Sequence, residues 1–256
     1  TEFQELRLMD IAAGKAKVAD INVIAILDMS GSMQGREVET RGGFNAFLAN
    51  AQEDQRDGGG KITLSLTCFD TAFEPVYPPT PVERVKPIGP KEYTPRGMTA
   101  LHDAIGLTLS PLRFPKDEKV MVIISTDGLE NSSHEWTAET VKKLIEDTEK
   151  LAWEFLFMGV GLDAFAASKA FASESMLNAT VSTPMTAGAV ELGMSFASNS
   201  MRLFRRGDSL SDSVAALYED PTSDLIDRSV ADQRPVARPA EASATPVKPR
   251  KGRERA

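Results

Sequence analysis

Short apolar runs alternate along the chain with longer amphipathic segments. Two runs are almost continuously apolar, Ile21–Leu27 and Val120–Ile124, which is the pattern of central strands in a parallel sheet covered on both faces. A third run, Trp153–Met158, ends at a Gly-Val-Gly turn. In Lys61–Asp70 larger apolar residues alternate with polar or smaller ones, which predicts a half-exposed strand. These four segments are the predicted strands.

Helical spacing of apolar residues predicts helices between and after these strands. The predicted helices cover residues 34–56, 101–105, 141–148 and 189–204. In the first of them the Gly42-Gly43 pair costs about 2 kcal/mol of helix propensity, so we expect a kink or close packing there. This alternation of strand and helix predicts a doubly wound α/β sheet.

Two regions depart from this pattern. Seven of the fifteen prolines lie between Pro75 and Pro95, which predicts a long surface loop. From about Glu219 onward Ala, Pro, Arg and Lys dominate and aromatic residues are absent, which predicts a disordered tail.

Composition narrows the classes of protein to consider. Apolar residues make up 41% and charged residues 26%, a normal balance for a soluble globular protein. The most apolar stretch, Leu151–Ala167, contains Glu154 and Asp163, so we expect no transmembrane helix. The single cysteine, Cys68, can form neither an internal disulfide nor a cysteine zinc site and is expected in the core. With no secretory signal visible, the cytoplasm is the expected compartment.

Charge is unevenly distributed. The net charge is −8, although residues 233–256 hold seven Lys or Arg against two Glu. An acidic body does not suit nucleic-acid binding, which needs clustered positive charge, but it suits a protein that collects cations. Only the basic tail could touch nucleic acid or acidic lipid, and a solvated tail is the simpler interpretation.

Oxygen-bearing side chains follow the first predicted strand. Asp28, Ser30 and Ser32 alternate in a turn between this strand and a helix, where their side chains can converge on one point. Such an all-oxygen set prefers the hard cations Mg²⁺, Ca²⁺ or Mn²⁺. Ordinary N-capping of the next helix is the competing interpretation.

Two more loops offer oxygen donors at the same edge of the sheet. Asp127 follows the strand Val120–Ile124 and precedes Gly128, and Thr99 stands just before a predicted helix. Alone, these would be a plain turn and a helix cap. In an open α/β sheet, however, ligands bind outside the carboxyl ends of the strands, where all three loops gather. The three loops together predict one metal site.

These motifs resemble the metal-ion-dependent adhesion site of von Willebrand factor type A domains, and are most similar to intracellular bacterial and phage members. The matching segments are Asp28-x-Ser30-x-Ser32, Gly97-x-Thr99-Ala100-Leu101-x-Asp103-Ala104-Ile105 and Thr126-Asp127-Gly128. The resemblance implies a Rossmann-like α/β domain over residues 19–204 with one antiparallel edge strand. Residues 1–18 would be an N-terminal extension and residues 205–256 a disordered tail.

The resemblance also implies roles for single residues. Ser30, Ser32 and Thr99 would contact the metal, most simply Mg²⁺, through their hydroxyls, and Asp28 and Asp127 directly or through water. An Asp or Glu of a partner protein would fill the remaining coordination position. A further partner in such families is an AAA+ ATPase of the MoxR or chelatase type.

Other polar residues near these loops leave alternatives open. Glu130 and Asn131 either line a partner-binding face or belong to a solvated loop. His102 or His134 could serve as a general base, but we favour spectators because no nucleophile pairs with them.

Two glycine-rich segments resemble nucleotide-binding motifs. Gly159-Val160-Gly161-Leu162-Asp163-Ala164 matches the dinucleotide fingerprint, but the acidic residue required about 20 positions later is missing. Lys61 follows three glycines but precedes Ile62 rather than Ser or Thr, so no P-loop is predicted.

The sequence therefore predicts a non-enzymatic, metal-dependent protein-binding module that acts as an adaptor or assembly subunit. Two alternatives remain: a metal-dependent phosphoester or ester hydrolase at the same site, and a structural subunit whose metal site is unused.

Overall fold

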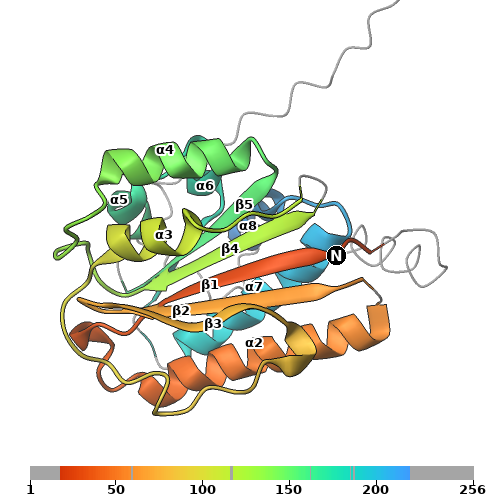
Figure 1. Ribbon diagram of the computed structural model, residues 1–256, viewed down its shortest axis with the longest axis horizontal. Helices are drawn as coiled ribbons and strands as arrows, with labels where there is room; N and C mark the ends of the chain where they lie inside the picture. The colour runs from red at the N-terminus through yellow and green to blue at the C-terminus, as the bar shows by residue number, and fades with distance from the viewer. Residues whose placement is uncertain are drawn as a thin grey trace, which may run out of the picture.

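A single six-stranded sheet forms the centre of the molecule, with strand order β3-β2-β1-β4-β5-β6 (Figure 1). The computed structural model describes residues 18–219 except 59, 116, 117, 162, 185 and 187. The strands are β1 (Ile21–Asp28), β2 (Ile62–Phe69), β3 (Phe73–Pro81), β4 (Lys119–Thr126), β5 (Trp153–Val160) and β6 (Thr180–Thr183).

Pairing along the sheet is parallel except at one edge, where β3 runs antiparallel to β2. The chain leaves β1 toward β2 on one side and later returns to place β4 on the other side, so the strand order reverses between β1 and β4. This topology confirms the predicted α/β fold, including the antiparallel edge strand.

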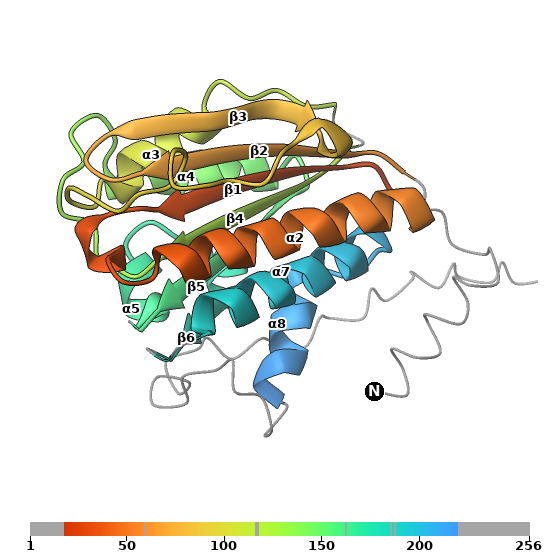
Figure 2. The same cartoon turned by 90° about the horizontal axis from the view of Figure 1, so that it is seen from below.

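Helices cover both faces of the sheet (Figures 1 and 2). On one face α2 and α7 lie side by side with α8 next to them, and on the other lie α3, α4, α5 and α6. The helices are α2 (Glu37–Gly58), α3 (Leu101–Leu109), α4 (Ala138–Glu149), α5 (Ala164–Ser168), α6 (Glu174–Asn178), α7 (Ala189–Arg205) and α8 (Leu210–Glu219), with 3-10 turns η1 (Gly31–Met33) and η2 (Val82–Arg84).

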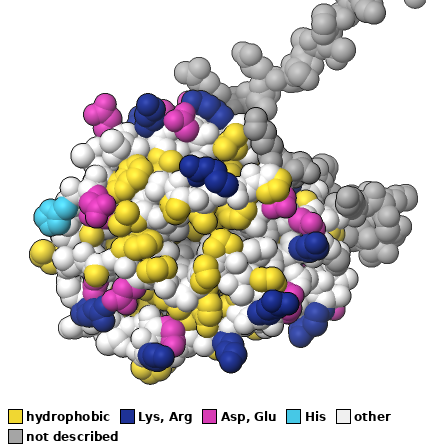
Figure 3. All heavy atoms as spheres, in the orientation of Figure 1, with side chains coloured by type: hydrophobic (Ala, Val, Ile, Leu, Met, Phe, Trp, Pro, Cys, Tyr) yellow, Lys and Arg dark blue, Asp and Glu magenta, His cyan; other side chains and the backbone are white. Residues whose placement is uncertain are grey.

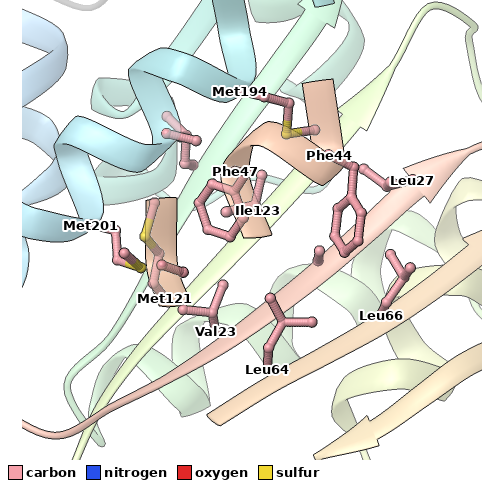
Figure 4. Close-up of a cluster of buried hydrophobic side chains, with 14 of the residues drawn as sticks. Val23, Leu27, Phe44, Phe47, Leu64, Leu66, Met121, Ile123, Met194 and Met201 are labelled. Atoms are coloured by element: carbon pink, nitrogen blue, oxygen red, sulfur yellow. The ribbon is translucent and has the colours of Figure 1, made fainter. Parts of the chain in front are cut away.

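Alternate residues of β1 supply two hydrophobic cores. Val23 and Leu27 face α2 and α7 in the core shown in Figure 4, whereas Ile24 and Ile26 face α3 and α4. Burial of each such side chain stabilises the fold by roughly 1.5–3 kcal/mol. The strand is therefore apolar along its whole length, as the sequence predicted.

The Gly42-Gly43 pair serves close packing of helices. A Cβ added at Gly43 would lie 3.2 Å from the Cα of Glu191 and 3.3 Å from the carbonyl oxygen of Val190, both in α7. Glycine thus lets α2 approach α7 backbone to backbone, which is one of the two expected explanations for the pair.

The prediction that β2 is half-exposed is wrong. Leu64 and Leu66 face the α2 side, and most of the alternate residues, Ser65, Thr67 and Phe69, are buried as well. Thr67 is buried beneath α3, where its hydroxyl is 3.1 Å from the hydroxyl of Thr108, which donates to it. The polar positions that suggested an exposed face are therefore satisfied inside the protein.

The proline-rich segment is not all loop, which corrects a second prediction. Residues 73–81 form the edge strand β3, whose Pro75, Pro78, Pro79 and Pro81 are exposed. Proline is tolerated there because an edge strand has one side without strand partners, and the missing N–H groups discourage pairing with another chain. Figure 3 shows the molecule in the orientation of Figure 1, with apolar side chains near the middle of the view and most charged side chains toward its outline.

The predicted tail begins too early. Arg205 still belongs to α7, and α8 follows with Leu210 and Val214 buried, so residues 205–219 are part of the folded domain. Residues 220–256, like residues 1–17 of the predicted extension, lie outside the described residues. Within the described part of the chain, none of the helices combines the length and hydrophobicity needed to span a bilayer.

Candidate metal centre

The predicted site residues lie at the carboxyl ends of β1 and β4, at the left of Figure 1. Asp28 is the last residue of β1, Asp127 directly follows β4, and Thr99 stands two residues before α3. The strand order reverses between these two strands, and this is the point where open α/β sheets bind ligands.

A chain of hydrogen bonds connects four of the five predicted ligands. The backbone N–H of Ser30 donates to Asp28 Oδ1 at 2.7 Å. The hydroxyls of Ser30 and Ser32 are 2.9 Å apart, and Ser32 donates to Asp127 Oδ1 at 2.6 Å. Side chains 95 residues apart in sequence thus meet directly.

Thr99, the fifth predicted ligand, lies close to the other four, as the surroundings of Gly128 show. A Cβ added at Gly128 would lie 2.9 Å from Thr99 Oγ1 and 3.5 Å from Ser32 Oγ. Both hydroxyls therefore face the space that a side chain at position 128 would fill. The structure brings all five predicted residues together.

Burial disfavours the charged forms of the two carboxyl groups in this centre. Asp28 is 1% exposed, and burial raises the pKa of its carboxyl group to about 6, against hydrogen bonds from Thr126 and Ser30 that lower it. Burial also raises the pKa of Asp127, although the Ser32 hydrogen bond and the Arg36 charge act in the opposite direction. A nearby cation would favour the charged form of both carboxylates.

The donor set fits a hard divalent cation. It consists of two carboxylates and three hydroxyls, the all-oxygen chemistry that Mg²⁺, Mn²⁺ and Ca²⁺ prefer. Within the described residues no group of three or more His, Cys, Asp or Glu could hold a metal ion. A site here therefore depends on the hydroxyls of Ser30, Ser32 and Thr99.

Residues outside the motifs hold the first loop in place. The buried Tyr93 hydroxyl donates to the carbonyl oxygen of Asp28 at 2.6 Å. The backbone N–H of Gly31 donates to the Gly97 carbonyl at 3.1 Å, and that of Arg96 to the Met29 carbonyl at 2.8 Å. Sequence reasoning missed Tyr93, because it lies in the proline-rich segment and no local pattern marks its contact.

Glu130 and Asn131 brace the loops, a role that neither earlier interpretation contained. Asn131 Oδ1 accepts from the Thr99 N–H at 2.9 Å, and the Asn131 N–H donates to the Thr99 carbonyl at 3.0 Å. Glu130 accepts from the N–H of His102 at 2.9 Å, in the first turn of α3. The Asp127 loop is thereby fixed to the Thr99 loop.

Asp103, in α3, also joins segments beside the site, and we call the hydrogen bonds of Glu130, Asn131 and Asp103 the clasp. Its carboxylate accepts three backbone N–H groups of the segment before α4, from His134 at 2.8 Å, Glu135 at 2.9 Å and Trp136 at 2.7 Å. Asp103 belongs to the motif that carried the family resemblance, and its position explains why a carboxylate is useful there.

The two histidines and the cysteine lie in structural surroundings. His102 packs edge-on against Phe171 with ring centroids 5.4 Å apart, and burial lowers its pKa although Glu130 opposes this. His134 is exposed. Cys68 is buried, as expected, and burial raises the pKa of its thiol to about 12, which leaves it unreactive.

Comparison with known proteins identifies the fold. No protein-family model matches the sequence, and no curated protein matches it. Among solved structures, the vWF domain of the type V pili tip protein Mfa5 from Porphyromonas gingivalis superposes with a TM-score of 0.55 over 75% of this chain and 98% of that one, at 11% identity. The chain has the fold of a von Willebrand factor type A domain.

Two larger proteins share this type A fold. The pilus adhesin SpaC from Lactobacillus rhamnosus GG matches 72% of the chain with a TM-score of 0.55 and 14% identity. Proximal thread matrix protein 1 from the mussel byssus, in a form with a zinc-occupied MIDAS motif, matches 72% with a TM-score of 0.51 and 14% identity. The chain spans only 30% of the adhesin and 47% of the matrix protein.

Proposed function

We propose that this type A domain is a metal-dependent protein-binding module. Asp28, Ser30, Ser32, Thr99 and Asp127 would hold one divalent cation, Mg²⁺ in the first place, with Mn²⁺ or Ca²⁺ as alternatives. The observation that carries the proposal is that the carboxylates of Asp28 and Asp127 are linked by hydrogen bonds through Ser30 and Ser32 at the switch point of the sheet. The zinc-occupied MIDAS motif of the mussel protein supports a divalent cation on this fold.

The chain's own residues prepare the site for an acidic ligand. Where Asp28 and Asp127 act through water, the ligands in direct contact with a divalent cation are neutral hydroxyls, so the cation stays electrophilic toward a carboxylate from outside. Ser32 is exposed and Asp127 half-buried, whereas Asp28, Ser30 and Thr99 are buried. Access is thus from the side of Ser32 and Asp127, where the Asp or Glu of a partner would bind.

The role we propose is binding rather than catalysis. A hydrolase at this site would need a base close to the reacting group, and His102 is instead held against Phe171 and Glu130. We further propose that the module acts in the cytoplasm, and that an AAA+ ATPase of the MoxR or chelatase type is among its partners.

Affinity purification with and without EDTA tests this proposal. The immobilised full chain in Mg²⁺ should capture proteins that EDTA elutes and mass spectrometry identifies, whereas Asp28→Ala should capture none of them. Asp147→Ala, which removes an exposed carboxylate of α4, is the matched control and should behave like the wild type. Equal capture by Asp28→Ala would contradict the proposal, and phosphoester turnover lost in Asp127→Ala would favour a hydrolase.

A further inference from the structure

Large apolar side chains stand exposed beside the candidate metal centre. Among the described residues, Met98 is 54% exposed and Leu129 is 62% exposed. Both belong to the loops that carry predicted ligands: Met98 directly precedes Thr99, and Leu129 follows Asp127 by two residues. Since successive Cα atoms are about 3.8 Å apart, each Cα lies within about 8 Å of that of a predicted ligand.

The backbones of the two residues lie close together, because their loops are joined. Asn131 exchanges two hydrogen bonds with Thr99, at 2.9 and 3.0 Å. Thr99 directly follows Met98, and Asn131 stands two residues after Leu129. We call Met98 and Leu129 the apolar rim.

Hydrogen bonds hold the rim in place. The backbone N–H of Met98 donates to the Thr71 hydroxyl at 2.8 Å. The residue after Leu129 is Glu130, whose carboxylate accepts from the N–H groups of Ser132 at 2.9 Å and Ser133 at 2.7 Å. Exposure of the rim is thus a property of braced loops beside the candidate metal centre.

Charge limits the kind of partner that can cover the rim. The chain has a net charge of −8, so a ligand rich in Asp and Glu is repelled as it approaches. Close to the site the field differs, since the Arg36 charge acts on Asp127. One carboxylate with apolar neighbours fits this surface better than an acidic run.

We propose that the apolar rim selects partner segments in which a single Asp or Glu stands next to a large apolar side chain. The inference rests on the proposed function, because the carboxylate would bind at the metal centre while its neighbour packs on Met98 and Leu129. Burial of one such neighbour strengthens binding by about tenfold.

A peptide library displayed on phage tests this proposal. The library is panned on the immobilised full chain in Mg²⁺ and eluted with EDTA, using the wild type, the double variant Met98→Gln/Leu129→Gln, and Leu151→Gln. Leu151 is the matched control, since it is 39% exposed but lies before β5, at the opposite end of the sheet. Thermal midpoints in EDTA check that all three chains are folded.

The wild type and Leu151→Gln should enrich peptides with an acidic residue next to Leu, Ile, Met or Phe. The double variant should still enrich the acidic residue but not its apolar neighbour, and a selected peptide should bind it about tenfold more weakly. Enrichment of acidic residues without apolar neighbours on the wild type would overturn the inference and leave the proposed function intact.

Two other results would also overturn it. If EDTA elutes no acidic peptides from any of the three chains, the proposed function fails and the inference fails with it. If the wild type forms Mg²⁺-dependent dimers in sedimentation and the double variant does not, a second copy of the chain covers the rim instead of an acidic partner segment.

Discussion

Buried carboxylates at the two ends of the sheet have different kinds of partner. At the amino end, Asp54 of α2 accepts a hydrogen bond from Arg205, whose side chain is 0% exposed. Oδ1 of Asp54 also lies 3.6 Å from Nε of Arg202. At the carboxyl end, the groups that lower the pKa of Asp28 are the hydrogen-bond donors of Thr126 and Ser30, and burial still raises that pKa to about 6. The first carboxylate has a protein cation as its partner, whereas the second suits an external one.

The ends also differ in what their hydrogen bonds connect. At the amino end Arg205 joins the end of α7 to the start of β1, since its Nε donates to the Ala19 carbonyl at 3.1 Å and its carbonyl accepts from the Ala19 N–H at 3.1 Å. At the carboxyl end, Glu130, Asn131 and Asp103 join loops to one another around a polar centre. One end serves stability, and the other positions side chains for a ligand.

The largest effect on stability is expected at the amino end. Asp54→Asn leaves the buried guanidinium of Arg205 without its carboxylate, which should lower the free energy of unfolding by about 3 kcal/mol. Urea denaturation measures it. Asp147→Asn breaks an exposed ion pair with Lys150 and should leave the midpoint close to that of the wild type. If the two variants lose similar amounts, the amino end does not depend on this pair.

A smaller loss is expected from the clasp. Glu130→Ala removes an acceptor shared by the N–H groups of His102, Ser132 and Ser133, which should cost about 1–3 kcal/mol. Because the Thr99 and Asp127 loops depend on this brace, Mg²⁺ binding should weaken as well. Glu135→Ala, in the same loop but exposed, is the control for both measurements. Full Mg²⁺ affinity in Glu130→Ala would show that the clasp does not position the ligands.

The smallest effect has the opposite sign. In EDTA, Asp28→Asn should stabilise the protein by about 1 kcal/mol, because it removes a carboxylate whose charge is opposed by burial. The same urea experiment detects this change. A loss of stability comparable to that of Asp54→Asn would remove the difference between the two ends.

Strand ends made much of the site predictable. Asp28 directly follows one continuously apolar run and Asp127 stands three residues after another, and parallel strands bring the ends of both runs to one edge of the sheet. Thr99 follows from its place before α3 and from the family resemblance. The contact of Tyr93 with Asp28 spans 65 residues and left no local pattern, so only the fold reveals it.

Elsewhere, tertiary packing overrode local patterns. Thr67 suggested an exposed face on β2, but its partner is Thr108 in a helix that the sequence cannot place against it. In α8, by contrast, Leu210, Val214 and Leu217 stand at helical spacing, a signal that sequence reasoning could have used. The bias of the following residues toward Ala, Pro and Arg concealed this short helix.

Titration calorimetry with MgCl₂ on the full chain measures whether the carboxyl end of the sheet binds a metal ion. One ion should bind per wild-type chain, and Glu135→Ala, which removes a nearby exposed carboxylate, should bind it as well as the wild type. Asp28→Asn and Asp127→Asn should bind none. Equal binding by all four chains, or no binding by the wild type, would contradict a metal centre built from Asp28, Ser30, Ser32, Thr99 and Asp127.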